Sequence, residues 1–430
     1  MNKEILRLAI PNILSNISVP LLSSVDTLLM GRLSAEHVAA VGIGSMIFNF
    51  IYWNFGFLRM GTTGITAQAF GRRAQSDLML TLARALLVAA ILAMLILILQ
   101  VPLAQLSFRI MGVDDSYAPL VADYFFTRIW AAPATLALYA LTGWFFGMQN
   151  AWIPLLLTIF INLVNIACSY VFVVHWGLAA RGVAMGTVIA QIAGLAMGIA
   201  LWWWHYRHLW RIAVWKGLRQ IAPLRQFLLI NRDIFLRTVA LTFAFGFFYQ
   251  QSAFMGVTTL AINTILLQYF NWMSYGIDGF AYAAESIVGK YAGQSNELLT
   301  RRAIRYSLFW GMGLACLYAA IYYLWGNDIL YLFTNKPDLQ AAARPFLWWM
   351  AVLPFFGAPS FIWDGVFIGL TASKAMRNSM LWALALFLII YFPLRASWGN
   401  DALWLAMVCF MAARGAIQWW MFRRQGLTLS

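Results

Sequence analysis

Long apolar stretches separated by short polar connections follow one another along the whole 430-residue chain. Twelve stretches can be counted, with approximate bounds at 10–33, 38–69, 83–108, 118–148, 152–176, 182–205, 233–256, 259–290, 303–333, 340–371, 376–397 and 400–422. About 20 apolar residues in a helix cross the hydrocarbon core of a bilayer, so each stretch is long enough to span a membrane. The strands of a membrane barrel alternate apolar and polar positions, which these stretches do not. The pattern predicts an all-α integral membrane protein with twelve transmembrane helices.

The second half of the chain resembles the first. GWFFG at 143–147 has a counterpart in GVFIG at 365–369, and Met-Gly at 30–31 has one in Met-Gly at 255–256. The polar connection 206–232 lies between the two sets of six stretches. Six helices give both sets the same orientation, so we predict two pseudo-symmetric six-helix lobes related by an axis along the membrane normal. The predicted domains are an N-lobe at 1–205, a basic cytoplasmic linker at 206–232 and a C-lobe at 233–430.

Composition and charge support a membrane protein. Hydrophobic residues make up 63% of the chain and charged residues only 10%, whereas a soluble domain carries about 25% charged residues. A net charge of +14 would suggest a nucleic-acid partner in a soluble protein. Here Lys and Arg are concentrated in alternate connections, so we expect no nucleic-acid partner. The positive-inside rule then places both termini and the 206–232 linker in the cytoplasm.

Asp26 is the only ionisable side chain between Arg7 and Arg32, so it lies within the first apolar stretch. A carboxylate in the membrane is costly and is by default a candidate for an ion or proton pathway. The alternative is an acid that snorkels to the interface. Pro11 and Pro20 in the same stretch each remove a backbone hydrogen bond and permit a bend. We interpret the stretch as a moving helix that carries a functional carboxylate.

Polar residues recur at helical spacing in the fifth and sixth stretches. Asn162, Asn165 and Ser169 are separated by three and four residues and share one helical face. Thr187 and Gln191 do the same on the next helix. We predict that both faces line an N-lobe cavity and hydrogen-bond the carboxyl group of the first stretch. The alternative is that they only connect helices within the lobe.

The C-lobe stretches contain three acids, Asp278, Glu285 and Asp364. Asp278 and Glu285 are seven residues apart and lie near one face of the eighth stretch. Acids at this depth are candidates for function. The competing interpretation is that they form structural ion pairs with Arg237 or Arg414.

The sequence contains no pattern typical of a cofactor, metal or catalytic site. Cys168, Cys316 and Cys409 are far apart and have no metal-ligand spacing. There is no HExxH pattern and no GxxxxGK loop. We therefore expect no cofactor, no metal site, no catalytic residues and no enzymatic activity.

Several motifs spread over nearly the whole chain indicate a family resemblance. They are Pro11 with VDTLLMGRL (25–33), GWFFGMQN (143–150), GVAMGTVIAQ (182–191), RDIFLRT (232–238), DGFAYAAESIVG (278–289) and WDGVFIG (363–369). Together they resemble the MATE family of multidrug and toxin extrusion transporters, specifically its DinF-like branch. The resemblance implies twelve helices in two lobes and the export of organic cations and other amphiphiles against a proton or sodium gradient.

The resemblance also implies roles for individual residues. Asp26 matches the first-helix aspartate proposed as the coupling site in this family, and Pro11 matches the proline at which that helix bends. Asn165 and Thr187 match polar residues of the N-lobe cavity. Asp364 matches an acid that binds cations in the NorM-like branch.

One departure from the family pattern affects the coupling site. Ser169 stands where many DinF-like members have a second aspartate, so a two-acid proton site cannot be transferred whole. The N-lobe therefore offers Asp26 as its single candidate acid. Asn165, Thr187 and Ser169 could still supply neutral oxygens to sodium, which is the alternative coupling ion. The C-lobe offers a second candidate site for sodium in its acids Asp278, Glu285 and Asp364.

The sequence thus predicts a secondary active antiporter that exports organic cations, amphiphilic drugs or toxic metabolites in exchange for protons by rocking of its two lobes. We expect a monomer in the bacterial cytoplasmic (inner) membrane, in contact with membrane lipid. The alternative function is a flippase for a lipid-linked precursor. Such a flippase would need basic residues within its cavity, and Arg237 is the main candidate for that role.

Overall fold

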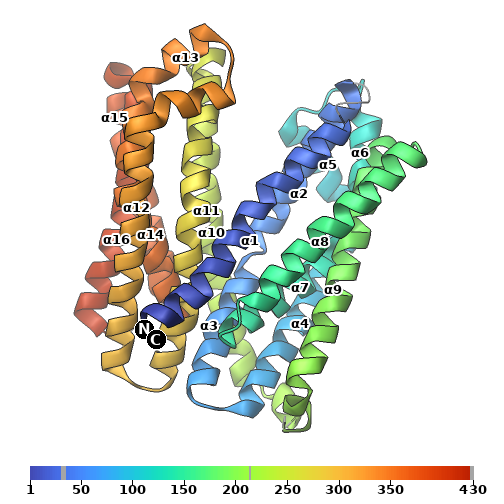
Figure 1. The fold of residues 1–430 in the computed structure, drawn as a ribbon, viewed down its shortest axis with the longest axis vertical. Coiled ribbons are helices and arrows are strands. Elements are labelled where there is room, and N and C mark those ends of the chain that lie inside the picture. The colour runs from blue at the N-terminus through green and yellow to red at the C-terminus, as the bar shows by residue number, and fades with distance from the viewer. Residues whose placement is uncertain (31–34, 213–214, 427–430) are drawn as a thin grey trace. The chain divides into compact units, whose positions relative to one another are not determined.

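The computed structural model describes residues 1–30, 35–212 and 215–426, without the side chains of residues 19–30, 35 and 215. Within these residues, every regular element is helical (Figure 1). Each of the twelve predicted stretches coincides with one long helix or with a run of consecutive helices. In the described part of the chain, nine such spans are long and apolar enough to cross a membrane.

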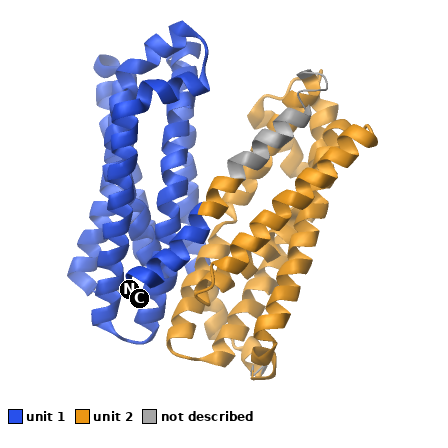
Figure 2. Ribbon diagram, in the orientation of Figure 1, with its two compact units in different colours: residues 1–13, 228–430 blue, residues 14–227 orange. Residues whose placement is uncertain are grey.

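The chain folds as two compact units (Figure 2). Unit 1 consists of residues 1–13 and 228–430, and unit 2 consists of residues 14–227. The division falls inside two helices, α1 (Asn2–Met30) and α10 (Ile221–Phe254). The start of α1 thus belongs with the second half of the chain, where Ala9 and Ile13 lie against Gly279.

Unit 2 contains most of α1 and the helices up to the middle of the chain. These helices are α2 (Ala35–Asn54), α3 (Phe57–Gly71), α4 (Gln75–Ile98), α5 (Gln100–Met111), α6 (Ala118–Arg128), α7 (Ala132–Gly147), α8 (Trp152–Tyr170) and α9 (Ala179–Ile212). Helix α7 packs against α3 and α4, and α9 packs against α7 and α8. The buried indole of Trp144 joins two of them by donating from Nε1 to the carbonyl oxygen of Leu78 at 2.8 Å.

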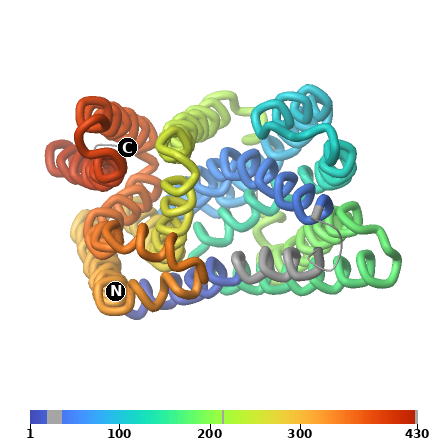
Figure 3. Tube along the Cα trace, turned by 90° about the horizontal axis from the view of Figure 1, so that it is seen from above, coloured from blue at the N-terminus to red at the C-terminus, as the bar shows by residue number. Residues whose placement is uncertain are grey.

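Unit 1 repeats this arrangement. Its helices are most of α10, α11 (Val257–Gly293), α12 (Glu297–Phe333), α13 (Pro337–Ala343), α14 (Leu347–Gly369), α15 (Ser373–Trp398) and α16 (Asn400–Gln425). Helix α14 packs against α11 and α12, and α16 packs against α14 and α15. Helices α15 and α16 lie side by side (Figure 3). The sequential order of the contacting helices is therefore the same in both units.

The glycines of the predicted repeat form equivalent contacts in the two units. A Cβ atom added to Gly143 in α7 would clash with the carbonyl oxygen of Arg59 in α3. A Cβ atom added to Gly365 in α14 would clash in the same way with the carbonyl oxygen of Ala281 in α11. Only glycine allows two membrane helices to approach so closely. The repeat in the sequence therefore corresponds to a repeated helix contact.

The connection 206–232, predicted as a linker, is largely helical. Helix α9 continues to Ile212, a short 3-10 helix covers Trp215–Arg219, and α10 begins at Ile221. The guanidinium of Arg84 in α4 donates to the carbonyl oxygen of Gly217 at 2.8 Å. Polar residues therefore continue both helices beyond their apolar stretches, and the short 3-10 helix between them packs on α4.

Candidate functional site

Each unit contains a cluster of polar side chains that includes residues predicted to be functional. In unit 2 the cluster is neutral and joins α1, α8 and α9 through hydroxyl and amide groups. In unit 1 the cluster is charged and joins α10, α14 and α16. We call them the hydroxyl–amide cluster and the arginine–aspartate cluster.

Helices α1 and α8 are connected by hydroxyl and amide groups. The Ser15 hydroxyl donates to Oγ1 of Thr158 at 2.9 Å, and Nδ2 of Asn162 donates to Oγ of Ser18 at 3.2 Å. Sequence reasoning found Asn162 but missed the other three residues. The signal was available, because residues 15 and 18 on α1, and 158 and 162 on α8, have the spacing of one helical face.

Helices α8 and α9 are connected through Asn165, which is almost completely buried. The Thr187 hydroxyl donates to the carbonyl oxygen of Val183 at 3.1 Å and accepts from Nδ2 of Asn165 at 3.0 Å. Because Thr187 has a single hydrogen to donate, these contacts fix the orientation of the Asn165 amide. Its Oδ1 atom is then a buried acceptor that receives no hydrogen bond within the described residues.

Ser169 lies one helical turn further along α8 and is fully buried. Its hydroxyl also makes no hydrogen bond to any of the described residues. A Cβ atom at Gly186 in α9 would lie 2.5 Å from Oγ of Ser169, so this glycine leaves space for the hydroxyl. Buried polar groups are nearly always paired, so these two neighbours on α8 are a candidate place for a polar partner.

The side chains of the predicted N-lobe cavity do not all contact the same helix. Asn162 and Asn165 were expected to face the same group, but Asn162 contacts α1 and Asn165 contacts α9. Gln191 is half-buried in α9. Asp26 and Pro20 lie in α1, and their side chains are outside the part of the chain that the structure describes.

Helix α1 remains a continuous helix through Pro11. Pro11 is buried and lies two residues before the boundary between Ile13 and Leu14 at which α1 passes from unit 1 to unit 2. A proline inside a helix has no N–H for the carbonyl group four residues earlier, so this turn is held by one hydrogen bond fewer. The predicted hinge at Pro11 therefore lies next to the division between the units.

Asp364 in α14 is the centre of the arginine–aspartate cluster and is 5% exposed. Its Oδ2 atom accepts hydrogen bonds from Arg237 in α10 and from Nη2 of Arg414 in α16, the second at 2.5 Å. Its Oδ1 atom accepts from Nε2 of Gln418 in α16 at 2.7 Å. Both carboxylate oxygens are thus occupied by donors from two neighbouring helices.

The arginine–aspartate cluster has the arrangement that the ion-pair interpretation predicts for Asp364. The guanidinium of Arg414 is fully buried and lies over the rings of Phe361 and Phe410, with 5.6 and 5.5 Å to the ring centroids. Removing one partner of such a buried ion pair leaves the other charge uncompensated, which is strongly destabilising. A cation bound at Asp364 would have to displace a guanidinium that is already there.

The other two acids of unit 1 lie on α11. The Asp278 carboxylate also interacts electrostatically with Arg414. Glu285 is buried, and both acids have interaction partners. Sequence reasoning missed Gln418, although it lies four residues after Arg414 on the same face of α16.

Unit 1 contains a further buried amide that can be compared with Asn165. Asn263 in α11 donates from Nδ2 to Oγ of Ser252 and to Oδ1 of Asn400, both at 2.7 Å. Its Oδ1 accepts from Nδ2 of Asn400 at 3.0 Å and from Nε1 of Trp404 at 2.9 Å. Both polar atoms of the Asn263 amide therefore have hydrogen-bond partners, whereas Oδ1 of Asn165 has none within the described residues.

Comparisons with known proteins agree with one another. The family model MatE matches residues 11–171 and 235–394. The chain is 35% identical over 429 residues to DNA damage-inducible protein F of Escherichia coli (strain K12), covering 96% of this chain and 90% of the relative. It is 27% identical to a probable multidrug resistance protein NorM of Pseudomonas syringae pv. tomato, covering 92% of this chain and 86% of the relative.

The fold is similar to that of a solved structure described as the outward-facing conformation of a multidrug resistance MATE family transporter of the MOP superfamily. The TM-score is 0.89 at 18% identity, and the match covers 100% of this chain and 96% of that chain. The predicted fold class is confirmed: the protein is an all-α, multi-pass membrane protein with twelve transmembrane helices in two lobes. Nine of the twelve predicted stretches correspond to helical spans that are long and apolar enough to cross a membrane within the described residues.

Proposed function

The chain belongs to the MatE family of membrane transporters, and on this basis we propose that it exports small organic cations and amphiphilic compounds in exchange for protons. The multidrug resistance proteins among its relatives support the class of substrate. We propose Asp26 as the residue that binds and releases the coupling proton.

The proposal that protons rather than sodium ions drive transport rests on the hydrogen bonds that Asp364 already accepts. Sodium needs several oxygen ligands in a compact site, and the oxygens of Asp364 already accept from Arg237, Arg414 and Gln418. A proton needs only one carboxylate. The first apolar stretch contains one in Asp26, with no other ionisable side chain between Arg7 and Arg32.

The unpaired polar groups of the hydroxyl–amide cluster support the proposal that a carboxyl group near them gains and loses a proton. A protonated carboxyl group can donate one hydrogen bond, whereas a carboxylate only accepts. The Oδ1 atom of Asn165 has no donor among the described residues, and the Ser169 hydroxyl can donate or accept. We propose that the two groups receive the Asp26 carboxyl group in one state of the transport cycle and are available to water or substrate in the other.

Coupling requires that the proton and the substrate favour different states of the transporter or compete for one site. We propose that protonation of Asp26 favours release of the substrate, and that rocking of the two lobes exposes the cavity to alternate sides of the membrane. Helix α1 would bend at Pro11, where the turn lacks a backbone hydrogen bond.

The proposal is tested with the full chain in proteoliposomes that contain a fluorescent organic cation such as ethidium. Proton and sodium gradients are imposed separately. We expect efflux with the proton gradient alone, and loss of efflux when a protonophore is added while an inward sodium gradient is maintained. Efflux that survives the protonophore and requires sodium would contradict the proton assignment.

Two variants test the assignment to a residue. Asp26→Asn mimics the protonated form and is expected to insert normally but to lose gradient-driven efflux. Asp115→Asn removes an exposed acid between α5 and α6 and is the matched control, with wild-type efflux expected. Equal efflux from both variants would show that Asp26 does not couple transport to protons.

The flippase alternative has less support. Arg237, its main basic candidate, is engaged by Asp364 and would have to leave that carboxylate to bind a pyrophosphate group. Transport of a lipid-linked sugar by the same proteoliposomes, without ethidium efflux, would favour it.

We also propose that both termini are cytoplasmic and that the membrane is the bacterial inner membrane. Lys216, in the short helix between α9 and α10, is exposed and can be replaced by cysteine in a background without native cysteines. In intact cells, membrane-impermeant thiol reagents should not label this cysteine, and ready labelling would reverse the orientation.

A further inference from the structure

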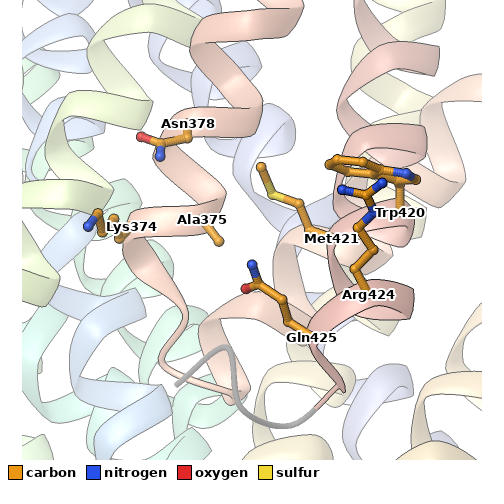
Figure 4. Close-up of a pocket in the computed structure, with 7 residues that line it drawn as sticks. All are labelled: Lys374, Ala375, Asn378, Trp420, Met421, Arg424 and Gln425. Atoms are coloured by element: carbon orange, nitrogen blue, oxygen red, sulfur yellow. The ribbon is translucent and has the colours of Figure 1, made fainter.

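A cavity of about 320 Å³ lies between the beginning of α15 and the end of α16 (Figure 4). Its side chains include Lys374 and Asn378 of α15 and Trp420, Met421, Arg424 and Gln425 of α16. Figure 4 shows that Met421 and Gln425 extend from α16 toward α15, whereas Arg424 lies against the ring of Trp420. The distance from Cζ of Arg424 to the ring centroid of Trp420 is 4.3 Å.

The polar groups that line the cavity are suited to an anion. Lys374 and Arg424 are exposed, form no ion pair within the described residues, and have no acid beside them in the lining. The Oδ1 atom of Asn378 accepts from Nε and Nη2 of Arg377 at 3.1 and 2.9 Å. These bonds fix the Asn378 amide, so its Nδ2 atom is left as a donor. The lining thus offers two cations and an amide donor.

The apolar surroundings favour a lipid over a soluble anion. Trp420 is 48% exposed on α16, and tryptophans at the ends of transmembrane helices lie at the level of the lipid headgroups. On α15, Trp382 and Ile389 are 67% and 66% exposed. Trp382 lies four residues after Asn378, and Ile389 lies seven residues after Trp382, so all three lie on one side of the helix. An exposed apolar stripe therefore runs from the cavity along a membrane-spanning helix.

We propose that this cavity binds the phosphate-bearing headgroup of an anionic phospholipid, whose acyl chains lie along the stripe on α15. Lys374, Arg424 and Asn378 hold the phosphate, and Trp420 and Met421 contact the glycerol and the upper acyl carbons. The site is separate from the arginine–aspartate cluster, and it requires neither a particular transported substrate nor a particular coupling ion.

The test uses the purified full chain in a mild detergent and native mass spectrometry. Phosphatidylglycerol and phosphatidylcholine with identical acyl chains are offered in equal amounts, and we expect preferential retention of phosphatidylglycerol. Arg424→Gln and Lys374→Gln should each weaken that binding about fivefold, since a basic residue near an anionic lipid surface contributes about 1 kcal/mol. Two variants on different helices protect the test against a folding defect in either one.

Arg423→Gln is the matched control. Arg423 precedes Arg424 on the same helix, carries the same charge and lies over Trp419 at 5.0 Å, but it does not line the cavity. Because Arg423 does not line the cavity, we expect its loss to weaken phosphatidylglycerol binding clearly less than the loss of Arg424. Equal losses from Arg423→Gln and Arg424→Gln would mean that the helix end attracts lipid only through its total charge, and would overturn the proposal.

Two further outcomes would assign the cavity to another occupant. Displacement of the lipid by an equal concentration of inorganic phosphate would make the cavity a site for soluble phosphate. Lipid retention that appears only after removal of residues 427–430 would make the carboxyl end of the chain the natural occupant. Retention of phosphatidylglycerol by the full chain in the presence of phosphate supports the lipid site.

Discussion

Equivalent helices contact one another in each of the two units of this transporter, but the polar side chains next to these contacts differ between the units. Gly143 in unit 2 and Gly365 in unit 1 form the same close contact between helix backbones. The residue before each glycine differs. Thr142 donates its hydroxyl hydrogen to the carbonyl oxygen of Leu138 on its own helix at 2.7 Å, whereas Asp364 accepts from two other helices.

This difference indicates how the units can divide their tasks. Buried charges that are compensated by specific partners oppose rearrangement, because separating them exposes an unpaired charge to an apolar interior. Neutral hydroxyl and amide groups exchange partners at much lower cost. We therefore expect the arginine–aspartate cluster to hold unit 1 in one arrangement, and the hydroxyl–amide cluster of unit 2 to accept a new partner more easily.

Asp364→Asn should destabilise the protein strongly, and we expect the largest loss of stability from this substitution. It leaves the guanidinium groups of Arg237 and Arg414 buried without a compensating charge, and breaking a buried pair costs about 3–5 kcal/mol. Thermal unfolding of the purified variant in detergent measures the loss.

Thr142→Ala is the matched control for this prediction in unit 2. The Thr142 hydroxyl bonds only within its own helix, so its removal should cost at most about 1 kcal/mol. An Asp364→Asn variant that unfolds at the wild-type temperature but does not transport would instead make Asp364 a transport residue.

Alanine at the two equivalent glycines should have similar effects in the two units. A Cβ atom at either position would approach a carbonyl oxygen of the neighbouring helix, so Gly143→Ala and Gly365→Ala should each cost about 1–3 kcal/mol through overpacking. The same unfolding measurement applies.

Gly313→Ala in α12 is the control for the glycine pair. A Cβ atom there meets nothing within 4 Å, so alanine should be neutral or should stabilise the helix by up to about 1 kcal/mol. Clearly unequal losses at Gly143 and Gly365 would show that the two helix contacts are not equivalent.

The two buried asparagines should separate stability from transport. Asn263→Ala leaves the donors of Asn400 and Trp404 without their acceptor and should cost about 1–3 kcal/mol. Asn165→Ala removes the hydrogen bond between Asn165 and Thr187. The Thr187 hydroxyl still donates to the carbonyl oxygen of Val183. We expect a loss below about 1 kcal/mol for Asn165→Ala, together with a large loss of ethidium efflux.

Efflux and unfolding temperature measured on the same preparations decide between these outcomes. Normal ethidium efflux by the Asn165→Ala variant would show that Asn165 contributes only to packing and has no role in transport. A stability loss as large as that of Asn263→Ala would mean that its Oδ1 atom is hydrogen-bonded after all.

The sequence predicted those features that depend on local spacing. Hydrophobic length predicted the helices, and the matching GWFFG and GVFIG segments predicted that the two halves repeat, although not that Gly143 and Gly365 form helix contacts. Partners across helices were harder to predict, because they depend on how each helix is rotated and tilted. The sequence named Arg237 and Arg414 as possible partners of Asp364, but it could not decide whether Asp364 is a functional acid or part of a structural ion pair. The rotation and tilt of the helices also determine that Gln418 contacts Asp364 and that residues 1–13 pack in unit 1.

The smallest expected effect concerns the start of α1, which belongs to unit 1. The Glu4 carboxylate accepts from Nζ of Lys290 at 3.0 Å and from the hydroxyl of Tyr291 at 2.9 Å. Partial burial raises the pKa of Glu4, but the hydrogen bonds from Lys290 and Tyr291 and the charge of Lys290 outweigh burial, so the pKa lies below its ordinary value of 4.5. A lowered pKa in the folded state means that the carboxylate stabilises the fold above the unfolded-state pKa, and that this contribution is lost as the pH falls through the folded-state value.

Glu4→Gln should therefore lower the unfolding temperature at neutral pH, and the difference from wild type should disappear at a pH well below 4.5. The effect should be at most about 1 kcal/mol, because the Glu4 side chain is 40% exposed and water and salt screen the ion pair. Raising the salt concentration at neutral pH should reduce the difference further. A difference that is the same at both pH values would show that Glu4 acts through packing, and that α1 is not held to unit 1 by charge at this end.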